Sequence, residues 1–232
     1  MRLKRLLQPV NWKLAVGELL LIVVGIWIAL GADAWNNARH KRDDQLWLLR
    51  ELRTSLAADL QGIENTARRL TEKEHRIDSL LVHLEHSGAY NSEMDRLFGA
   101  VYGVHAFQLN TSIYEMLKER GLDLISSDSL RLQLIEVFER RHRQLERADN
   151  LLLDVSLAVL RPYFLAHFSN IVFNESATPL AYSQVSRDPY FRNIAEYRLT
   201  VLRRSTTPAY QNAGKAITRL LRSIDEEIER MD

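Results

Sequence analysis

The residues best spaced to bind a metal lie near the end of a long charged segment. His83 and His86 are three positions apart, so a helix would place them on one face, with Glu85 between them. Structural and catalytic zinc sites use three or four protein ligands. No third ligand is evident on that face, and no zinc-protease spacing is present. We therefore expect a solvated helix end here, with no metal and no cofactor.

A basic run, Arg-Arg-His-Arg at 140–143, is the strongest candidate for binding phosphate groups. Nucleic-acid sites need basic residues in excess over a surface. Here Glu139 and Glu146 bracket the run, and the whole chain carries 31 Lys and Arg against 30 Asp and Glu. We expect an exposed helix face at 140–143 and no nucleic-acid partner.

Four aromatic or basic residues beside a poorly helical connector, residues 167–187, are candidate ligand contacts: Tyr163, His167, Tyr182 and Arg187. Such side chains next to an irregular loop can line a ligand pocket. Aromatic packing under the loop explains the same residues and is the favoured interpretation. The chain contains no cysteine, no glycine-rich phosphate loop and no G-x-S-x-G motif, so no catalytic residue and no enzyme activity is predicted.

The element around which the rest is organised is the apolar segment at residues 14–37. No side chain from position 19 to position 32 is charged. The segment has about the ~20 residues that a helix needs to cross ~30 Å of hydrocarbon. Trp12 and Trp35 lie where aromatic anchors at the headgroups are expected. We predict a transmembrane helix at 14–37, following a tail at 1–13.

One side of this segment has small residues in its middle and polar residues at its ends: Glu18, Ile22, Gly25, Ala29, Ala32 and Asn36. Small residues let helix backbones approach closely in lipid, so we expect this face to mediate self-association. A carboxylate one turn inside a span must be paired, protonated or near the headgroups. For Glu18, an interfacial position near Lys13 and a polar contact between helices both stay open.

A cleaved signal peptide is the alternative interpretation of the N-terminal region. Basic residues precede an apolar stretch, and Ala32-Asp33-Ala34 fits a cleavage site. Glu18 interrupts the apolar stretch, and helix-compatible sequence continues past the site, so an uncleaved anchor is favoured. Residues 1–13 carry four basic and no acidic side chains. This flank predicts a cytoplasmic tail, with the C-terminal domain on the other side of the membrane.

The rest of the chain predicts helices, because nine glycines and five prolines are few for 232 residues and helices tolerate few of either. A stripe with steps of three and four follows the apolar segment: Leu49, Leu52, Leu56, Leu60, Ile63, Ala67, Leu70, Ile77, Leu81 and Leu84. It predicts a coiled coil or the first helix of a bundle. We expect an all-α protein, with a long stalk or bundle helix at 38–87 and a helical bundle at 88–232.

Capping residues and prolines predict boundaries within the bundle. Ser112 with Glu115 fits a capping box, Gly121 fits a helix C-terminus, and Ser127 or Asp128 fits an N-cap. Further signals are Arg161-Pro162, which ends or kinks a helix, Asp188-Pro189, which begins one, and a break in the last helix near 205–208.

Two sets of residues form a distinctive pattern along the chain. The first set is Gly17-Glu18, Gly25-Ile26, Ile28-Ala29-Leu30 and Trp35-Asn36, followed by Leu48-Leu49 and Leu52. The second set comprises Tyr114, Arg120-Gly121, Leu122, Leu124-Ile125 and Leu130. In these residues the chain resembles a bacterial family of single-span membrane proteins of unknown function. The resemblance implies an N-terminal span with a helical remainder in a bacterial inner membrane, and with a cytoplasmic tail the C-terminal domain is expected in the periplasm. It lends no catalytic residues.

Together these patterns predict a membrane-anchored helical assembly or protein-interaction module that associates with a lipid bilayer and with copies of itself. The alternative is an extracytoplasmic ligand-sensing bundle that signals through a membrane-protein partner. A sensor predicts a pocket near the connector. A scaffold instead predicts that the stripes of the long helices bury against other chains.

Overall fold

The computed structural model describes the backbone of residues 12–231, and the side chains of these residues except at 12–18, 29, 32–34, 37 and 38. The chain divides into two compact units, Met1–Trp47 and Leu48–Asp232. Helix α1, Trp12–Glu85, begins in the first unit and ends in the second. Every described residue of the first unit, 12–47, is helical.

The predicted transmembrane helix at 14–37 does form a helix, as part of α1. However, none of the helices that the structure describes is long and apolar enough to cross a membrane. This finding does not support the predicted span. The predicted tail at 1–13 lies, up to residue 11, outside the described residues.

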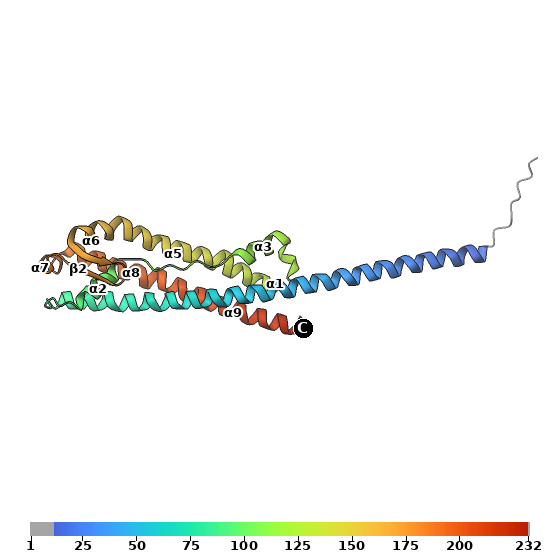
Figure 1. Cartoon of the computed structure of the whole chain (residues 1–232), viewed down its shortest axis with the longest axis horizontal. Coiled ribbons are helices and arrows are strands. Elements are labelled where there is room, and N and C mark those ends of the chain that lie inside the picture. The colour runs from blue at the N-terminus through green and yellow to red at the C-terminus, as the bar shows by residue number, and fades with distance from the viewer. Residues whose placement is uncertain (1–11, 232) are drawn as a thin grey trace, which may run out of the picture. The chain divides into compact units, whose positions relative to one another are not determined.

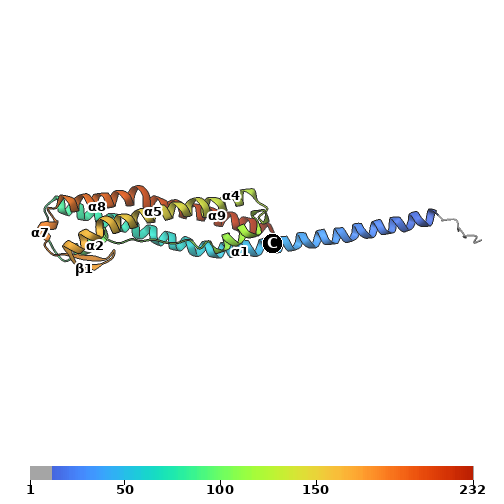
Figure 2. The same cartoon turned by 90° about the horizontal axis from the view of Figure 1, so that it is seen from above.

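The second unit is built from long helical runs that lie side by side (Figures 1 and 2). The first run is α1 from Leu48 onward. The next run comprises α4 (Asp128–Ile135), η2 (Glu136–Arg141), α5 (His142–Val155), η3 (Ser156–Leu160) and α6 (Arg161–His167), and the last comprises α8 (Pro189–Val201), η4 (Leu202–Thr206) and α9 (Thr207–Met231). Shorter elements cover the ends: α2 (Met94–Val101), α3 (Ser112–Arg120), η1 (Leu122–Leu124) and α7 (Tyr182–Val185).

Two ion pairs fix the direction of the last run relative to α1. Arg53, near the start of this part of α1, pairs with Asp225 near the end of α9. At the opposite end of the unit, Arg192 at the start of α8 approaches Glu85 at 3.9 Å. The last run is therefore antiparallel to α1.

The segments η2, η3 and η4 are π-helical turns. Proline lacks an N–H, and its ring clashes with the carbonyl four positions earlier. Pro162 lies two residues after the end of η3, and Pro208 two residues after the end of η4. The wider π turn accommodates each ring without ending the helix. The break predicted near 205–208 is therefore wrong, because the helix continues through a π turn.

The connector at 167–187 contains a small antiparallel hairpin, so the all-α prediction is wrong there. Its strands are β1 (Phe168–Val172) and β2 (Ser176–Pro179), with Phe168 opposite Pro179 and an irregular register before Val172. Asn170 and Asn174 have positive φ angles of 48° and 66°. Asparagine tolerates this conformation better than most residues. The connector thus folds back on itself, and β2 packs on α2 (Figure 1).

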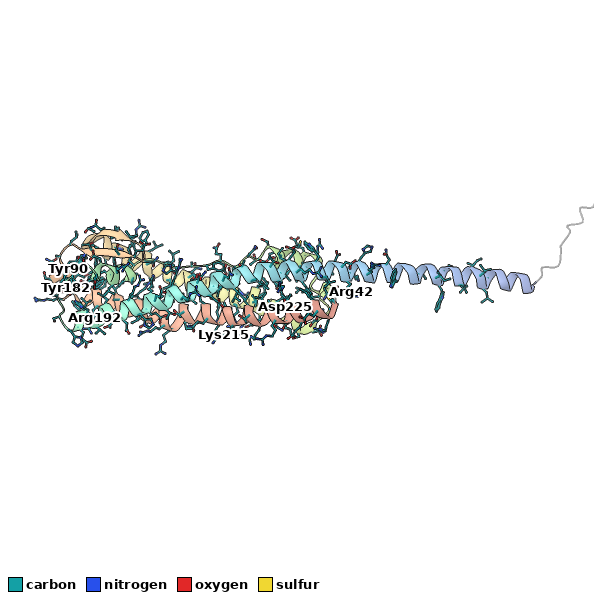
Figure 3. The ribbon with its side chains drawn as sticks, turned by 60° about the horizontal axis from the view of Figure 1, so that its bottom comes forward. Arg42, Tyr90, Tyr182, Arg192, Lys215 and Asp225 are labelled. Atoms are coloured by element: carbon teal, nitrogen blue, oxygen red, sulfur yellow. The ribbon has the colours of Figure 1, made fainter. Side chains whose placement is uncertain are left out.

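An aromatic cluster fills the core at this end of the unit. Phe98 of α2 is completely buried, with ring centroids of Phe168 and Phe191 at 5.2 and 5.7 Å. Tyr90 and Tyr182 lie together nearby, with ring centroids 5.3 Å apart (Figure 3). The cluster joins α2, β1, α7 and α8 into one packed end.

Most of the predicted caps are present. The Ser127 hydroxyl accepts a hydrogen bond from the Leu130 N–H at 3.3 Å, and the Asp188 carboxylate accepts one from Tyr190 at 2.9 Å. Gly121 ends α3 with a φ of 100°. The capping box at Ser112 is wrong, because this residue already lies inside α3 and the side chain of the N-cap residue, Thr111, makes no capping bond. Instead, the Asn110 side-chain oxygen accepts a hydrogen bond from the Ser112 N–H at 3.1 Å.

Candidate functional site

The buried stripe of α1 contains polar residues that organise the bundle interior. Its members alternate in steps of three and four: Leu49, Leu52, Leu56, Asp59, Ile63, Thr66, Leu70, Lys73, Ile77 and Leu80. Leu60, Ala67, Leu81 and Leu84, which we had placed in the stripe, are only partly buried beside it. The polar members are seven residues apart, so they recur on the same face.

An extended segment, residues 103–111, runs between α2 and α3; we call it the strap. Lys73 donates a hydrogen bond of 2.7 Å to the Gly103 carbonyl, and Asp59 accepts one of 3.1 Å from the Asn110 N–H. From Asp59 to Lys73 the helix advances fourteen residues, which corresponds to a rise of about 21 Å. The seven extended residues from 103 to 110 rise about 23 Å, so the two lengths match. The stripe thus supplies a donor and an acceptor where each end of the strap needs one.

The middle of the strap is held by a tyrosine from α9. The Phe107 N–H donates to the Tyr210 hydroxyl at 2.8 Å, and that hydroxyl donates to the Asp149 carboxylate at 2.9 Å. Burial raises the pKa of Asp149 to about 6, against the opposing effect of the Tyr210 hydrogen bond. Burial and the nearby carboxylate also raise the pKa of Tyr210 above its usual value.

This raised pKa predicts a pH dependence of stability. Between about pH 4 and pH 6 the folded chain holds a proton on Asp149 that the unfolded chain has released, so stability falls as pH rises through this window. The Asp149→Asn variant keeps an oxygen that can accept from Tyr210 and carries no charge to bury. We expect it to be more stable than the parent at pH 7 by about 1 kcal/mol, after allowing for screening at a half-buried site, and equal to it near pH 4. Urea unfolding at both pH values measures this, and a gain of equal size at both would contradict the assignment.

Two cations meet at the strap's first residue. Arg198 is 0% exposed and donates from Nη1 to the Leu152 carbonyl at 3.1 Å and from Nη2 to the Gly103 carbonyl. Lys73 is 3% exposed and donates to the same Gly103 oxygen and to the Asn174 side-chain oxygen. The buried Nε of Arg198 has no hydrogen-bond partner in the described part of the chain.

No carboxylate of the described residues pairs with either cation. Burial, followed by the charges of Arg198 and Arg76, holds the pKa of Lys73 well below its usual value. Burial likewise lowers the pKa of Arg198 to about 10. Taking charges out of water is costly unless an opposite charge compensates, so this is an electrostatically incomplete site.

Lys73 also lines a hollow of about 410 Å³, which we call the cationic pocket. Its walls are Arg69, Glu72, Lys73, Arg76, Ala100, His105, Phe173, Asn174 and Glu175. Burial first, and then the charges of Lys73, Arg69, Arg198 and Arg76, lowers the pKa of His105 to about 4. The nearby cations thus make the potential at His105 positive, although burial is the larger cause of the pKa shift.

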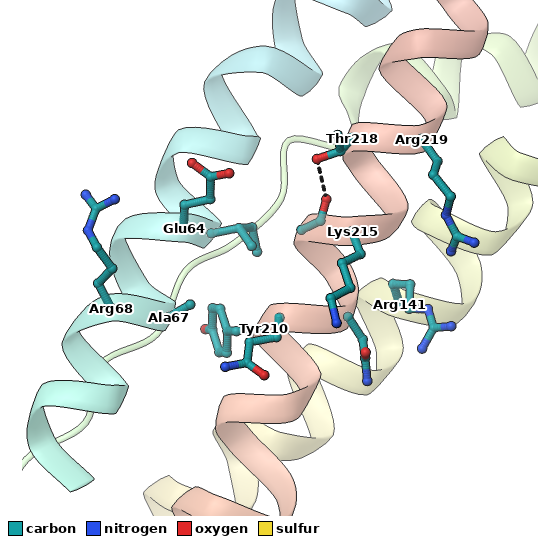
Figure 4. A pocket seen from close by; sticks show the side chains of 12 residues that line it. Glu64, Ala67, Arg68, Arg141, Tyr210, Lys215, Thr218 and Arg219 are labelled. Atoms are coloured by element: carbon teal, nitrogen blue, oxygen red, sulfur yellow. Dashed lines mark hydrogen bonds between the residues drawn. The ribbon is translucent and has the colours of Figure 1, made fainter. Parts of the chain in front are cut away.

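A second, open groove of about 720 Å³ runs between α1 and α9 (Figure 4). Ile63, Ala67 and Gly214 contribute apolar surface to it, and Arg68 and Lys215 extend from its two helices. Its opening arises partly because Gly214 has no side chain. Charged side chains also line the groove, but the most buried of them, Arg141, pairs with Glu136 at 2.6 Å, so the groove lacks the unpaired buried cations of the cationic pocket.

The four predicted ligand contacts lie elsewhere. Tyr163 and His167 have ring centroids 4.3 Å apart, and the Tyr163 hydroxyl donates to Asp188 at 2.6 Å. Tyr182 donates to the Gly88 carbonyl at 2.6 Å, and Arg187 is exposed. None of the four is among the described residues that line the cationic pocket.

The predicted metal and basic candidates make ordinary helix contacts. His83 and His86 interact with the carbonyl oxygens of Ala89 and Val82 at 3.2 and 2.8 Å. Across the described residues, no group of three or more side chains could hold a metal ion. In the basic run at 140–143, both Arg140 and Arg141 pair with Glu136, and His142 lies 3.4 Å from Glu146.

The predicted association face lies in the first unit. Ile22, Gly25 and Asn36 are exposed, whereas the side chains of Glu18, Ala29 and Ala32 are outside the described residues. Large apolar side chains around this face are 44 to 77% exposed: Leu19, Leu20, Leu21, Ile22, Val23, Val24, Ile26, Trp27, Ile28 and Leu30. A Cβ built on Gly25 or Gly31 meets no described atom within 4 Å.

The fold and these sites define a class: a helical-bundle protein with an exposed apolar helical segment before the bundle and a cationic pocket inside it. The profile of the family of unknown function DUF6090 matches residues 18–165, and the chain belongs to that family. No curated protein and no solved structure matches the chain. The expectation of a family of unknown function is thus confirmed, while its bacterial and single-span character stays a prediction.

Proposed function

We propose that this protein is a membrane-anchored helical assembly module that self-associates through the N-terminal part of α1. The observation that carries the proposal is the run of exposed apolar side chains at 19–30. Water contact costs about 25 cal/mol per Å² of apolar surface, so ten large side chains strongly favour a covering of lipid or protein. Runs of this size on a protein surface mark interaction sites.

Two partners together can cover the exposed apolar side chains at 19–30. A lipid bilayer covers most of the segment, in line with the predicted span at 14–37, and a second copy packs on the face that contains Gly25. The open space around Gly25 supports a close approach of backbones there. The orientation proposed is a bacterial inner membrane with the bundle in the periplasm. Protease added to intact spheroplasts tests that orientation, because only a periplasmic bundle is digested.

Cross-linking of the full chain in intact membranes tests the self-association. Gly25→Leu places a branched side chain on the proposed contact face, so we expect the yield of cross-linked dimer to fall at least about tenfold. Val23→Leu lies on the opposite side of the helix, and we expect it to leave the yield unchanged. Equal yields for parent, Gly25→Leu and Val23→Leu would sink the proposal.

A second candidate function, ligand sensing, is favoured by one observation. The hydrophobic stripe of α1 packs inside its own chain, whereas the cationic pocket adjoins the connector through Asn174 and Glu175. The ligand-sensing alternative predicts a pocket beside this connector, which is where the cationic pocket lies. Mass spectrometry of cross-linked material separates the candidates, since recovery of a different membrane protein in near-equal amount indicates a sensor and its signalling partner.

A further inference from the structure

The cationic pocket has a positive charge that the described residues leave unbalanced. Lys73 and Arg198 both donate to the Gly103 carbonyl, which is a dipole and does not supply the opposite charge that a buried cation needs. An ammonium group has three donors, and Lys73 uses two of them, on Gly103 and Asn174. The third is available toward the pocket that Lys73 lines.

Arginine side chains extend the positive charge to the mouth of the pocket. Arg69 and Arg76 line it and are exposed. Glu72 is three residues after Arg69 and four before Arg76, a spacing that permits ion pairs on a helix. In the described part of the chain neither arginine pairs with this carboxylate or with any other, so both guanidinium groups remain available to a ligand.

We propose that the cationic pocket binds a small oxyanion, a phosphate or carboxylate group, between Lys73, Arg69 and Arg76. Guanidinium groups present two parallel donors that match such oxygens, and an ammonium adds a point charge. An anion in this position supplies the opposite charge that the buried pair lacks. The bound charge also restores the ionised form of Lys73, which burial disfavours.

The carboxylates at the pocket limit the size of the ligand. Glu72 and Glu175 both line the rim and are exposed. Like charges repel, so they disfavour long polyanions such as nucleic acid and leave room for a compact group. Phe173 and Ala100 give the remaining wall an apolar character. The pocket therefore suits a small molecule with one anionic end.

Isothermal titration of the full chain in mild detergent tests the site, with inorganic phosphate and malonate as probes at constant ionic strength. We expect saturable binding of at least one probe. Arg76→Gln and Lys73→Met each remove a charge-assisted hydrogen bond, which corresponds to a loss of affinity of about tenfold or more. Glu72→Gln removes a repelling charge and is expected to tighten binding. Arg68→Gln is the matched control. Arg68 is one position before Arg69 but lines the open groove between α1 and α9, so we expect this variant to bind the probes as the parent does.

The outcomes are distinct. Binding of phosphate alone identifies a phosphorylated ligand class, and binding of malonate alone identifies a carboxylate class. No binding of either probe by the parent chain would overturn the inference, as would equal affinities for the parent, Arg76→Gln and Arg68→Gln. Arg76 is exposed, so its variant keeps the test decisive even if Lys73→Met fails to fold. None of these variants touches the segment at 19–30, so self-association is tested separately.

Discussion

Replacing Phe98 by alanine is expected to lower the free energy of unfolding by about 3–5 kcal/mol, the usual range for a buried phenylalanine. The side chain is 0% exposed, and its ring lies between those of Phe168, Tyr182 and Phe191. Its removal leaves a cavity where α2, the hairpin and α8 meet. Urea unfolding of the full chain in mild detergent, followed by far-UV circular dichroism, measures the loss.

Phe173→Ala is the matched control, because it deletes the same atoms from a ring that is 63% exposed. That ring makes an edge contact with Tyr102 at 5.1 Å and little else of its surface is covered. We expect a loss below about 1 kcal/mol. Similar losses for the two variants would show that the aromatic cluster is not the packed core described here.

The Gly99→Ala variant is expected to destabilise the chain by about 2–3 kcal/mol although alanine favours helix. A Cβ at this position would lie 2.2 Å from the backbone nitrogen of Ser176 and 2.4 Å from its Cα. The backbone of β2 cannot rotate away as a flexible side chain does, so α2 and the hairpin must separate. The same urea titration measures the effect.

Gly214→Ala makes the same chemical change in α9 with the opposite expected result. Its nearest neighbour would be the Ile63 Cγ2 atom at 3.5 Å, an ordinary contact. The gain in helix propensity then dominates, and we expect a stabilisation of about 0.5–1 kcal/mol. If Gly99→Ala were also stabilising, the close packing of α2 on the hairpin would be contradicted.

The long helix of α1 could be predicted from the sequence, but a choice by hydrophobicity alone misplaced part of its buried stripe. A stripe chosen for hydrophobicity passes through Leu60 and Ala67, whereas the buried positions are Asp59, Thr66 and Lys73. Polar residues are excluded from a core only when they lack partners, and the strap provides backbone partners for Asp59 and Lys73. The sequence did contain a signal for the true stripe. Asp59, Thr66 and Lys73 recur every seven residues and complete a pattern of buried positions that alternates in steps of three and four.

Helix starts at Ser127 and Asp188 were predictable because a capping bond is local. The hairpin was not predictable, because it forms against α2, which is distant in sequence. The prolines at 162 and 208 gave a local signal for a disturbed helix, but they did not tell a π turn from a helix end. The cationic pocket combines α1, the strap and the hairpin turn, and no local pattern relates these segments.

The strap also constrains the order in which the chain can fold. Gly103 receives Lys73 from 30 residues earlier and Arg198 from 95 residues later. Phe107 likewise depends on Tyr210, 103 residues further along. Domains tend to fold as units during synthesis, and contacts between distant residues form late. The carbonyl group of Gly103 and the amide group of Phe107 therefore stay hydrated until α8 and the start of α9 have been synthesised, and the native bundle closes only after Tyr210 has been added to the chain.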